Sequence, residues 1–414
     1  MSAYLRKKIA VCRELGLARL ALLPIATALV LLLLLLSKIS KVRVHQAQNG
    51  RIGHFTVPMA IRHLELSKEN RSLFARGVNL YAVTSIKSAN VFLEIMWKRT
   101  VPLISGNLGW LIVDLFKRIP KNQVCIKTSD DDRSGLLNQY SPCLTFKPDE
   151  IELGSNFLKN LGIVNEQKFV CLHVRDSSYL AESWNYFGYS KRHDWSHHDY
   201  RNSDISTYVA AADALAEMGY TVFRMGAIVE KPLNSKHPRV IDYATNGMRT
   251  EFLDIFLGAH CAFCVSTGSG WDSVPQIFRR PSLYVNLLPI FPHHCVVRDL
   301  MIYPKIIQDK VTKIDLGLAE IVKRDIQTKH ETHYYDSAGV EYREMSSEEL
   351  VIAVTEMAAR VEGTFVETPE QKQMQAKLKY IFSTHPKLQP TPNYYPIRAE
   401  FASCFLSNYP NFLD

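Results

Sequence analysis

The sequence has few of the residues that mark unusual classes of protein. Its 414 residues include only 8 cysteines, 19 glycines and 19 prolines, while 47% are hydrophobic and 22% are charged. This composition excludes a wholly disordered chain, a collagen-like chain and a small disulfide-stabilised protein. Internal repeats are absent, and a run of leucines is the only low-complexity tract. A chain of this length is expected to form two or three globular units.

Net charge is also missing from most of the chain. The formal charge is +8, but residues 1–51 alone contain nine basic residues and one acidic residue. The rest of the chain holds 40 basic and 40 acidic residues. A neutral body lacks the basic surface that binding to nucleic acid requires. The excess positive charge therefore flanks a single apolar segment.

That segment, Leu20–Leu36, contains 17 consecutive residues without a charge. A helix of this length reaches about 25 Å, near the minimum for crossing a bilayer. No small-residue cleavage site follows it, which favours a retained anchor over a cleaved signal peptide. Because both flanks are basic, charge does not fix the orientation. Two arrangements stay open: a single span, and a re-entrant or surface-lying helix, bent at Pro24, that leaves the body in the cytoplasm.

Cys171, Cys261 and Cys264 occur in apolar runs that are typical of buried strands. Thiols in core strands suit a reducing compartment, which favours the cytoplasmic face of the membrane. Cys261 and Cys264 have the spacing Cys-x-x-Cys, but no second cysteine pair follows at the spacing of a zinc site. The histidine pairs His197–His198 and His293–His294 also lack the spacing of metal ligands. No metal site is predicted, and the run Asp130–Asp132 is interpreted as a solvated loop.

Short apolar runs alternate with helical patterns from about Val44 onward, which predicts an α/β fold. Beyond residue 165 the alternation follows the pattern of a doubly wound parallel sheet. We therefore predict a membrane anchor with basic flanks (1–44), an N-terminal domain (45–165), a C-terminal domain (166–330) and a helical C-terminal extension (331–414). Capping boxes at Ser346 and Thr368 predict two helices in the extension.

Charged residues follow two strands predicted in the second domain. His173-Val174-Arg175-Asp176 ends one strand, and Arg224-Met225-Gly226 ends another. Ligands of doubly wound sheets bind just beyond the carboxyl ends of the strands. The planar guanidinium of an arginine engages two phosphate oxygens at once, so both arginines are candidates for binding a diphosphate. A salt bridge between Arg175 and Asp176 is the structural alternative.

A third candidate is Ser266-Thr267-Gly268-Ser269-Gly270, between a buried strand and a helix. Small residues allow close approach of the backbone, and a helix N-terminus offers N–H groups to an anion. The segment lacks the ending of a Walker loop. A tight turn capped by Asp272 is the alternative interpretation.

Two further sets of residues complete the candidates. Glu251 and Asp254 share one helix face, where they would bind ribose hydroxyls or complement the helix dipole. Tyr200, Arg201 and Asn202 precede another helix and are candidates for contact with the acceptor or with a neighbouring loop. Solvated loop residues are the simpler explanation for this second set.

Together, Arg51-Ile52-Gly53-His54, His173-Val174-Arg175, Tyr200-Arg201-Asn202, Arg224-Met225-Gly226 and Ser266–Gly270 resemble an uncharacterised bacterial glycosyltransferase family of surface-polysaccharide gene clusters. The His-x-Arg and Ser-Thr-x-Ser patterns also resemble motifs of fucosyltransferase-like GT-B enzymes. The resemblance covers about residues 45–300. It implies two Rossmann-like domains facing a cleft, with the nucleotide-sugar on the C-terminal one. Because Asp176 stands where a second basic residue is common, GDP-fucose is not implied as donor.

The hypothesis is a membrane-associated, metal-independent glycosyltransferase that moves a hexosyl or deoxyhexosyl group from a nucleotide-sugar to a glycan or lipid-linked acceptor. Fixed cations and N–H groups would stabilise the departing diphosphate, and His54 or Asp176 would deprotonate the acceptor. No cofactor besides the donor is expected. The body is placed on the cytoplasmic face of the bacterial inner membrane. The alternatives are a nucleotide-sugar epimerase or hydrolase on the same fold, and a non-catalytic polysaccharide-assembly protein.

Overall fold

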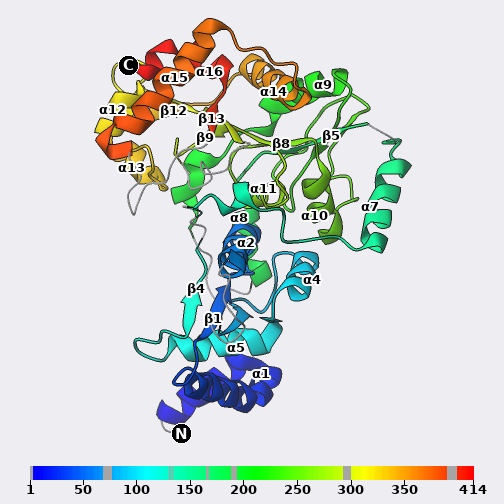
Figure 1. Ribbon diagram of the computed structural model, residues 1–414, viewed down its shortest axis with the longest axis vertical. Coiled ribbons are helices and arrows are strands. Elements are labelled where there is room, and N and C mark those ends of the chain that lie inside the picture. The colour runs from blue at the N-terminus through cyan, green and yellow to red at the C-terminus, as the bar shows by residue number, and fades with distance from the viewer. Residues whose placement is uncertain are drawn as a thin grey trace. The chain divides into compact units, whose positions relative to one another are not determined.

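The computed structural model describes residues 3–68, 77–129, 132, 134–164, 167–187, 194–291, 300–388 and 399–414. The chain divides into two compact units. Unit 1 comprises Met1–Asp131 and Cys143–Thr145, and unit 2 comprises Asp132–Pro142 and Phe146–Asp414. Each unit contains a parallel sheet with helices packed around it (Figure 1).

Unit 1 is built on a four-stranded sheet in the order β3-β2-β1-β4. Its strands are β1 (Val42–Ala47), β2 (Val78–Val83), β3 (Leu103–Ile104) and β4 (Cys125–Lys127), and all neighbouring strands are parallel. Its helices are α1 (Ala3–Leu36), α2 (Ile52–Lys68), α4 (Val91–Thr100) and α5 (Gly106–Lys117). This strand order is that of one half of a doubly wound sheet, and the winding reverses between β1 and β4.

Unit 2 contains a seven-stranded sheet in the order β13-β10-β9-β8-β5-β6-β7. The strands are β5 (Phe169–His173), β6 (Thr221–Arg224), β7 (Val240–Ile241), β8 (Phe263–Ser266), β9 (Ser282–Leu287), β10 (Leu300–Pro304) and β13 (Glu400–Phe401). Every neighbouring pair is parallel. Counted from β5, the first six strands follow the order of a complete doubly wound sheet, with the reversal between β5 and β8. The predicted α/β architecture is thus confirmed within unit 2.

The helices of unit 2 cover this sheet and a small antiparallel pair, β11 (Ile306–Asp309) with β12 (Val340–Arg343). The α-helices are α6 (Leu136–Gln139), α7 (Pro148–Asn160), α8 (Ser178–Phe187), α9 (Val209–Glu217), α10 (Glu251–His260), α11 (Ser273–Ile277), α12 (Leu318–Lys323), α13 (Thr332–Ser337), α14 (Ser347–Glu362), α15 (Pro369–Thr384) and α16 (Ser403–Asn408). The 3-10 helices are η1 (Ser196–Arg201), η2 (Ile205–Tyr208), η4 (Pro386–Leu388) and η5 (Pro410–Leu413). The capping boxes predicted at Ser346 and Thr368 open α14 and α15.

The division of the chain differs from the predicted one at both ends of the first domain. Val42 and Val44 belong to β1 and are buried in the core of unit 1, so residues 1–44 are not a separate anchor. At the other end, α7 belongs to unit 2 rather than to a domain that ends at residue 165. Its Gly154 lies so close to Phe256 that a Cβ would overlap the ring. Periodicity in sequence locates a helix but does not show which sheet it covers.

The predicted helical extension, residues 331–414, is an integral part of unit 2. It contains two strands, and β13 extends the large sheet by pairing with β10, with Phe401 opposite Ile302. Helix α14 packs against α9 of the same unit. β12 has four residues and β13 has two, which is too short for a clear alternation, so the pattern of this segment predicts helices alone.

Helix α1 packs along α5 within unit 1 (Figure 1). At Gly16 its backbone leaves the helical region, with φ 67° and ψ 153°, so α1 consists of two helices joined at a bend. The second of these contains the 19-residue apolar segment Ala18–Leu36, which is long enough to cross a membrane. One side of that segment contributes Ala26, Val30 and Leu33 to the apolar core of the unit.

Candidate functional site

The candidate residues of unit 2 lie at the carboxyl edge of the large sheet. Strand β5 ends at His173, β6 at Arg224 and β8 at Ser266. The loops after β5 and β8 diverge where the winding reverses, which is the position at which doubly wound sheets bind ligands. Two hydrogen bonds join these loops: the Thr267 N–H donates to the His173 carbonyl (3.2 Å), and the Arg175 N–H donates to Thr267 Oγ1 (2.9 Å).

The segment Ser266–Gly270, called the glycine turn below, is held by the buried side chain of Asp272. Its Oδ2 accepts hydrogen bonds from Ser266 Oγ (2.8 Å) and from the Ser269 N–H (2.6 Å). Gly268 has φ +81°, and a Cβ there would lie 2.9 Å from Leu287 Cδ1, so the turn requires glycine. The turn was expected to bind an anionic oxygen of a ligand, but here the carboxylate of Asp272 takes that place. Asp272 makes no capping bond to α11.

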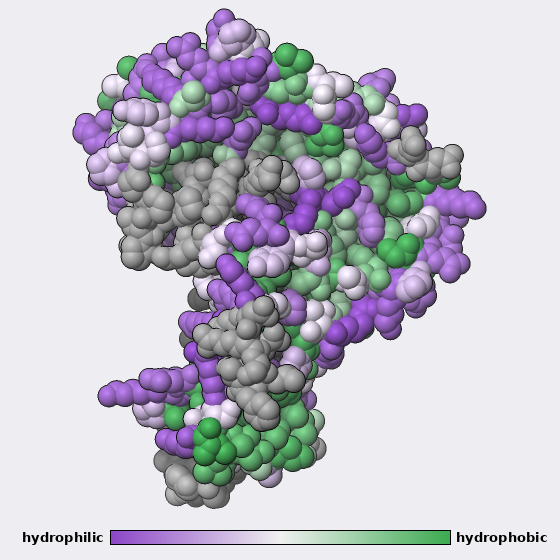
Figure 2. All heavy atoms as spheres, viewed as in Figure 1, coloured by the Kyte–Doolittle hydropathy of each residue, from purple (hydrophilic) through white to green (hydrophobic). Residues whose placement is uncertain are grey.

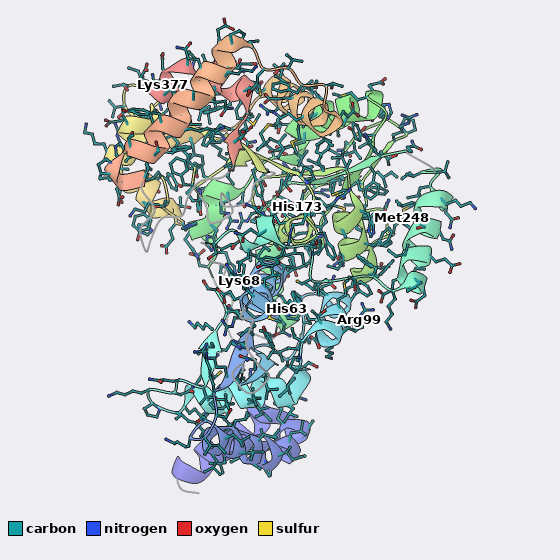
Figure 3. The ribbon with its side chains drawn as sticks, viewed as in Figure 1. His63, Lys68, Arg99, His173, Met248 and Lys377 are labelled. Carbon is teal, nitrogen blue, oxygen red and sulfur yellow. The ribbon has the colours of Figure 1, made fainter. Side chains whose placement is uncertain are left out.

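His173, which is labelled in Figure 3, contacts both this turn and an indole ring. Its Nδ1 is 3.1 Å from Ser269 Oγ, and its ring stacks on Trp271 with centroids 5.6 Å apart and planes 18° apart. Burial lowers the pKa of His173 to about 4, although the charge of Asp272 opposes this. The imidazole is therefore neutral near pH 7, and it orients the turn rather than supplying positive charge.

Two arginines join η1 to the strand ends. Arg175 Nη1 donates to the His198 carbonyl (3.2 Å) and to Asn202 Oδ1. Arg201 Nη2 donates to the Gly268 carbonyl. Burial and, after it, the nearby charge of Arg201 lower the pKa of Arg175 to about 10. The guanidinium groups are thus close enough to repel each other, in a region from which water is largely excluded.

Lys305 is a residue of this edge that the sequence analysis missed. It directly follows β10, and its Nζ donates to the Asn202 carbonyl (2.7 Å) and to Glu344 Oε1 (3.2 Å). Its side chain is 1% exposed. Burial lowers the pKa of Lys305, the charge of Glu344 raises it, and the charge of Arg175 lowers it. A lysine at the end of an apolar strand is the signal in the sequence that points to this site.

Arg224 is wholly buried at the end of β6. Its Nη1 lies 3.3 Å from Asp242 Oδ1, while Nε and Nη2 have no hydrogen-bond partner among the described residues. Gly226 follows in a tight turn, where a Cβ would lie 2.5 Å from Val229 Cγ1. Buried guanidinium donors without partners are uncommon, so Arg224 remains a candidate for contact with an anion.

Asp176 has a structural role at the same edge. Its Oδ1 accepts a hydrogen bond from the Ser178 N–H (2.8 Å), at the start of α8. Its Oδ2 accepts one from the Glu230 N–H (2.9 Å). Because both carboxylate oxygens are engaged by the backbone, Asp176 is a weaker candidate for a catalytic base than the sequence indicated.

The two carboxylates of α10 differ from each other. Asp254 pairs with Arg249 (2.6 Å) and accepts a hydrogen bond from the Tyr243 hydroxyl (3.3 Å), and burial raises its pKa to about 6. It therefore holds α10 to the preceding loop. Glu251 lies half-buried in the first turn of α10. Glu251 is the more exposed of the two and is therefore kept as the candidate for binding ribose.

Tyr200 belongs to the core and not to a solvated loop. It is wholly buried, and its ring centroid lies 5.2 Å from that of Tyr335. Burial raises its pKa to about 12. Tyr200 therefore supports η1 from beneath, whereas its neighbours Arg201 and Asn202 make the polar contacts of that segment.

A cavity of about 340 Å³ opens beside these residues in unit 2. Its charged lining side chains are Asp176, Asp199, Asp204, Glu230, Glu344, Lys231 and Lys305. The ring of Tyr342 and the amide of Asn202 also line it. Carboxylates accept hydrogen bonds from hydroxyl groups and repel phosphate, so the cavity is better suited to a sugar than to a diphosphate.

In unit 1, His54 lies in the first turn of α2 with its side chain exposed. The turn between β1 and α2 is fixed by Asn49, whose Nδ2 donates to the Ser85 carbonyl (3.0 Å) and whose Oδ1 accepts from the Ser85 N–H (2.9 Å). Arg51–His54 therefore occupies the carboxyl edge of the unit 1 sheet. It begins four residues after β1 and runs into α2, whereas Val174–Asp176 of unit 2 directly follows β5.

Within the described part of the chain, no group of three or more His, Cys, Asp or Glu side chains is arranged to hold a metal ion. The prediction of a solvated loop is wrong for Asp132. It is buried and accepts hydrogen bonds from the N–H groups of Leu136 and Leu137 (2.6 and 2.9 Å). Asp130, Asp131, His293 and His294 lie outside the described residues.

No protein-family model matches the sequence, and no curated protein matches it. Among solved structures, the chain is similar to the E. coli ADP-heptose lps heptosyltransferase II, with a TM-score of 0.37 and 13% identity. The match covers 64% of this chain and 90% of that one. A likeness this weak decides neither fold nor function, so both depend on the strand order and the contacts of the chain itself.

Proposed function

We propose that the protein is a membrane-associated, metal-independent glycosyltransferase. It transfers a hexosyl or deoxyhexosyl group from a nucleotide-sugar donor to a glycan or lipid-linked acceptor in surface-polysaccharide biosynthesis. The free thiols of Cys171 and Cys264, in the buried strands β5 and β8, suit the reducing cytoplasm in which nucleotide-sugars occur. The body therefore works on the cytoplasmic face of the inner membrane.

The cations at the carboxyl edge of unit 2 carry this proposal. Asn202 connects two of them, because it accepts from Arg175 through its side chain and from Lys305 through its carbonyl. Arg201 lowers the pKa of Arg175, and Arg175 lowers that of Lys305. Like charges held together in this way oppose folding. A bound diphosphate relieves their repulsion and gains charge-assisted hydrogen bonds.

The donor is arranged across this edge. Its diphosphate meets Arg175 and Lys305, and its sugar enters the adjacent cavity, which carboxylates and Lys305 line. Glu251, in the first turn of α10, is the candidate for binding the ribose. Fixed cations in a partly dry site stabilise charge that develops on the leaving diphosphate, so the reaction requires no metal ion.

For the base we propose His54, an exposed histidine in the first turn of α2. As the acceptor oxygen forms its bond to the anomeric carbon, the bond from that carbon to the phosphate oxygen breaks. The acceptor proton passes to His54, and the electron pair leaves with the nucleoside diphosphate. His54 is preferred over Asp176 because both oxygens of Asp176 are engaged by backbone N–H groups.

A thermal-shift panel of GDP, UDP, CMP and ADP, each with its sugars, tests the donor site. A ligand present at 100 times its Kd raises the free energy of unfolding by about 2.7 kcal/mol. Arg175→Ala should weaken binding by about 1.5–3 kcal/mol, or roughly 10- to 150-fold, and abolish most of the shift. It should also lower the Tm of the free protein, because Arg175 holds η1.

Arg324→Ala is the matched control. Arg324 is an arginine of unit 2 that binds Asp309 and Glu320, and it does not line the cavity. This variant should lose stability but keep the full ligand-induced shift. If Arg175→Ala also keeps it, Arg175 is only structural and the donor site is misassigned.

A further inference from the structure

The apolar segment Ala18–Leu36 of α1 has two faces of different exposure. Ala26, Val30 and Leu33, at the spacing of one helix face, are buried in unit 1. On the opposite side, the exposed fractions of Ile25, Leu31, Leu32 and Leu35 lie between 50% and 69%. Leu20–Leu36 contains no charged residue, and its one polar side chain, the exposed Thr27, donates a hydrogen bond to the Leu23 carbonyl (2.8 Å).

This exposed half forms a hydrophobic surface at α1, which Figure 2 shows as a green area. Half of the cylinder of such a helix presents on the order of 400 Å². A contiguous apolar patch of this size is comparable to the largest patch of a typical monomer, and such patches are often functional. Exposing these apolar side chains to water is unfavourable, so this side of the helix is expected to bind a partner.

The buried side of the helix opposes a position across a bilayer. Ala26, Val30 and Leu33 share one apolar cluster with Val44 of β1 and Phe116 of α5. The connection to β1 is also fixed, because the Ser37 N–H donates to the Leu33 carbonyl (2.9 Å) and the Ser40 N–H to the Leu36 carbonyl (2.9 Å). To become a span surrounded by lipid, α1 would have to leave the core of unit 1 and unwind this connection.

The ends of the segment carry groups that suit the headgroup region of a membrane. Arg19 lies over the ring of Trp110 of α5, 5.3 Å from its centroid. Lys38 and Lys41 are exposed at the other end. Residues 1–51 hold nine basic residues and one acidic residue. Tryptophan and basic side chains anchor proteins at the interface, and basic residues are attracted by anionic lipids.

We propose that α1 lies in the plane of an anionic bilayer surface, with its exposed half among the acyl chains and its buried half retained in unit 1. The partner is a lipid surface rich in anionic headgroups. This specifies how the membrane association proposed above is achieved, and it does not depend on whether the protein transfers a sugar.

Vesicle flotation of the full chain tests the face that binds. The variant Leu31→Asn, Leu32→Asn, Leu35→Asn should float at least tenfold less with vesicles of phosphatidylcholine and phosphatidylglycerol, with its Tm unchanged. A matched control, Ile95→Asn, Leu153→Asn, Val366→Asn, changes three apolar residues that are exposed outside α1. It should float like the natural protein. Unchanged flotation of the first variant, or equal flotation with pure phosphatidylcholine, overturns the proposal.

Depth measurements separate the two orientations. A fluorescent amino acid is placed at Ala21, Ala28 or Leu35, which are exposed on α1, and its quenching by spin-labelled lipids of two depths is compared. A helix in the plane of the membrane gives one shallow depth at all three positions. In a spanning helix, Ala28 would lie near the midplane and the other two positions about 10 Å closer to the headgroups. Such a graded profile overturns the proposal, whatever the outcome of the donor-binding panel.

Discussion

The two sheets share a strand order but differ at their carboxyl edges. In unit 1 the order is β3-β2-β1-β4, and in unit 2 the corresponding strands are β7-β6-β5-β8. The edge of unit 1 is held by neutral groups, since Asn49 bonds to the backbone of Ser85. The edge of unit 2 is held by charges, among them Arg175, Arg201 and Asp272. Each of these edges has the position at which doubly wound sheets bind ligands, and the residues after the strands determine which ligand such an edge would suit.

The largest loss of folding stability should come from removing the carboxylate of Asp272, which holds the glycine turn. Asp272→Ala leaves the Ser266 hydroxyl and the Ser269 N–H without their acceptor. Each unpaired buried donor costs about 1–3 kcal/mol, so the free energy of unfolding of unit 2 should fall by about 2–6 kcal/mol. Hydrogen exchange of peptides from β8, compared with peptides from β1, measures this loss separately in the two units.

Asp272→Asn is the control for this experiment, because an amide keeps one acceptor oxygen and should therefore cost less. A loss below about 1 kcal/mol in Asp272→Ala would mean that the turn is held by other contacts. An equal increase in exchange in β1 would mean that the two units do not unfold separately.

Acid should destabilise both units through corresponding central strands. Burial lowers the pKa of His45 in β1 and of His173 at the end of β5 to about 4. In the unfolded chain a histidine takes up its proton near pH 6.5. Between pH 6.5 and 4 the unfolded state therefore binds more protons, and stability falls as the pH falls. The loss approaches about 3 kcal/mol for each histidine.

Asp254 acts in the opposite direction. Its pKa is raised to about 6, so its ionisation lowers stability as the pH rises towards 6. For this reason, the unfolding free energy of the natural protein should be compared between pH 4 and 7 with that of His45→Gln and of His173→Gln. Each variant should have a flatter acid limb than the natural protein. Parallel curves would show that the histidine in question is protonated in the folded state.

Much of the fold could be predicted from the sequence, because short apolar runs such as Phe169–His173 alternate with helical patterns along the chain. The convergence of Arg175, Arg224 and Ser266–Gly270 followed from strand order alone. The partners of these residues could not be predicted, since the acceptor of the Ser269 N–H and the two donors to Asp176 depend on packing. The two faces of α1 were hidden for another reason: Leu20–Leu36 is apolar on every side, so no periodicity distinguishes them.

The smallest effect should come from the neutral edge of unit 1. Asn49→Ala removes two hydrogen bonds between uncharged groups, each worth about 0.5–1.5 kcal/mol. Ser85 is only half-buried, so water replaces part of what is lost. We expect the free energy of unfolding of unit 1 to fall by about 1–2 kcal/mol, seen as faster hydrogen exchange in β1 and β2, with β8 unchanged. Asn49→Asp keeps the acceptor for the Ser85 N–H and should recover part of the loss. If Asn49→Ala costs as much as Asp272→Ala, the two edges do not differ in the strength of their contacts. The charges of unit 2 would then have to be explained by ligand binding alone, since a neutral turn would hold a strand end equally well.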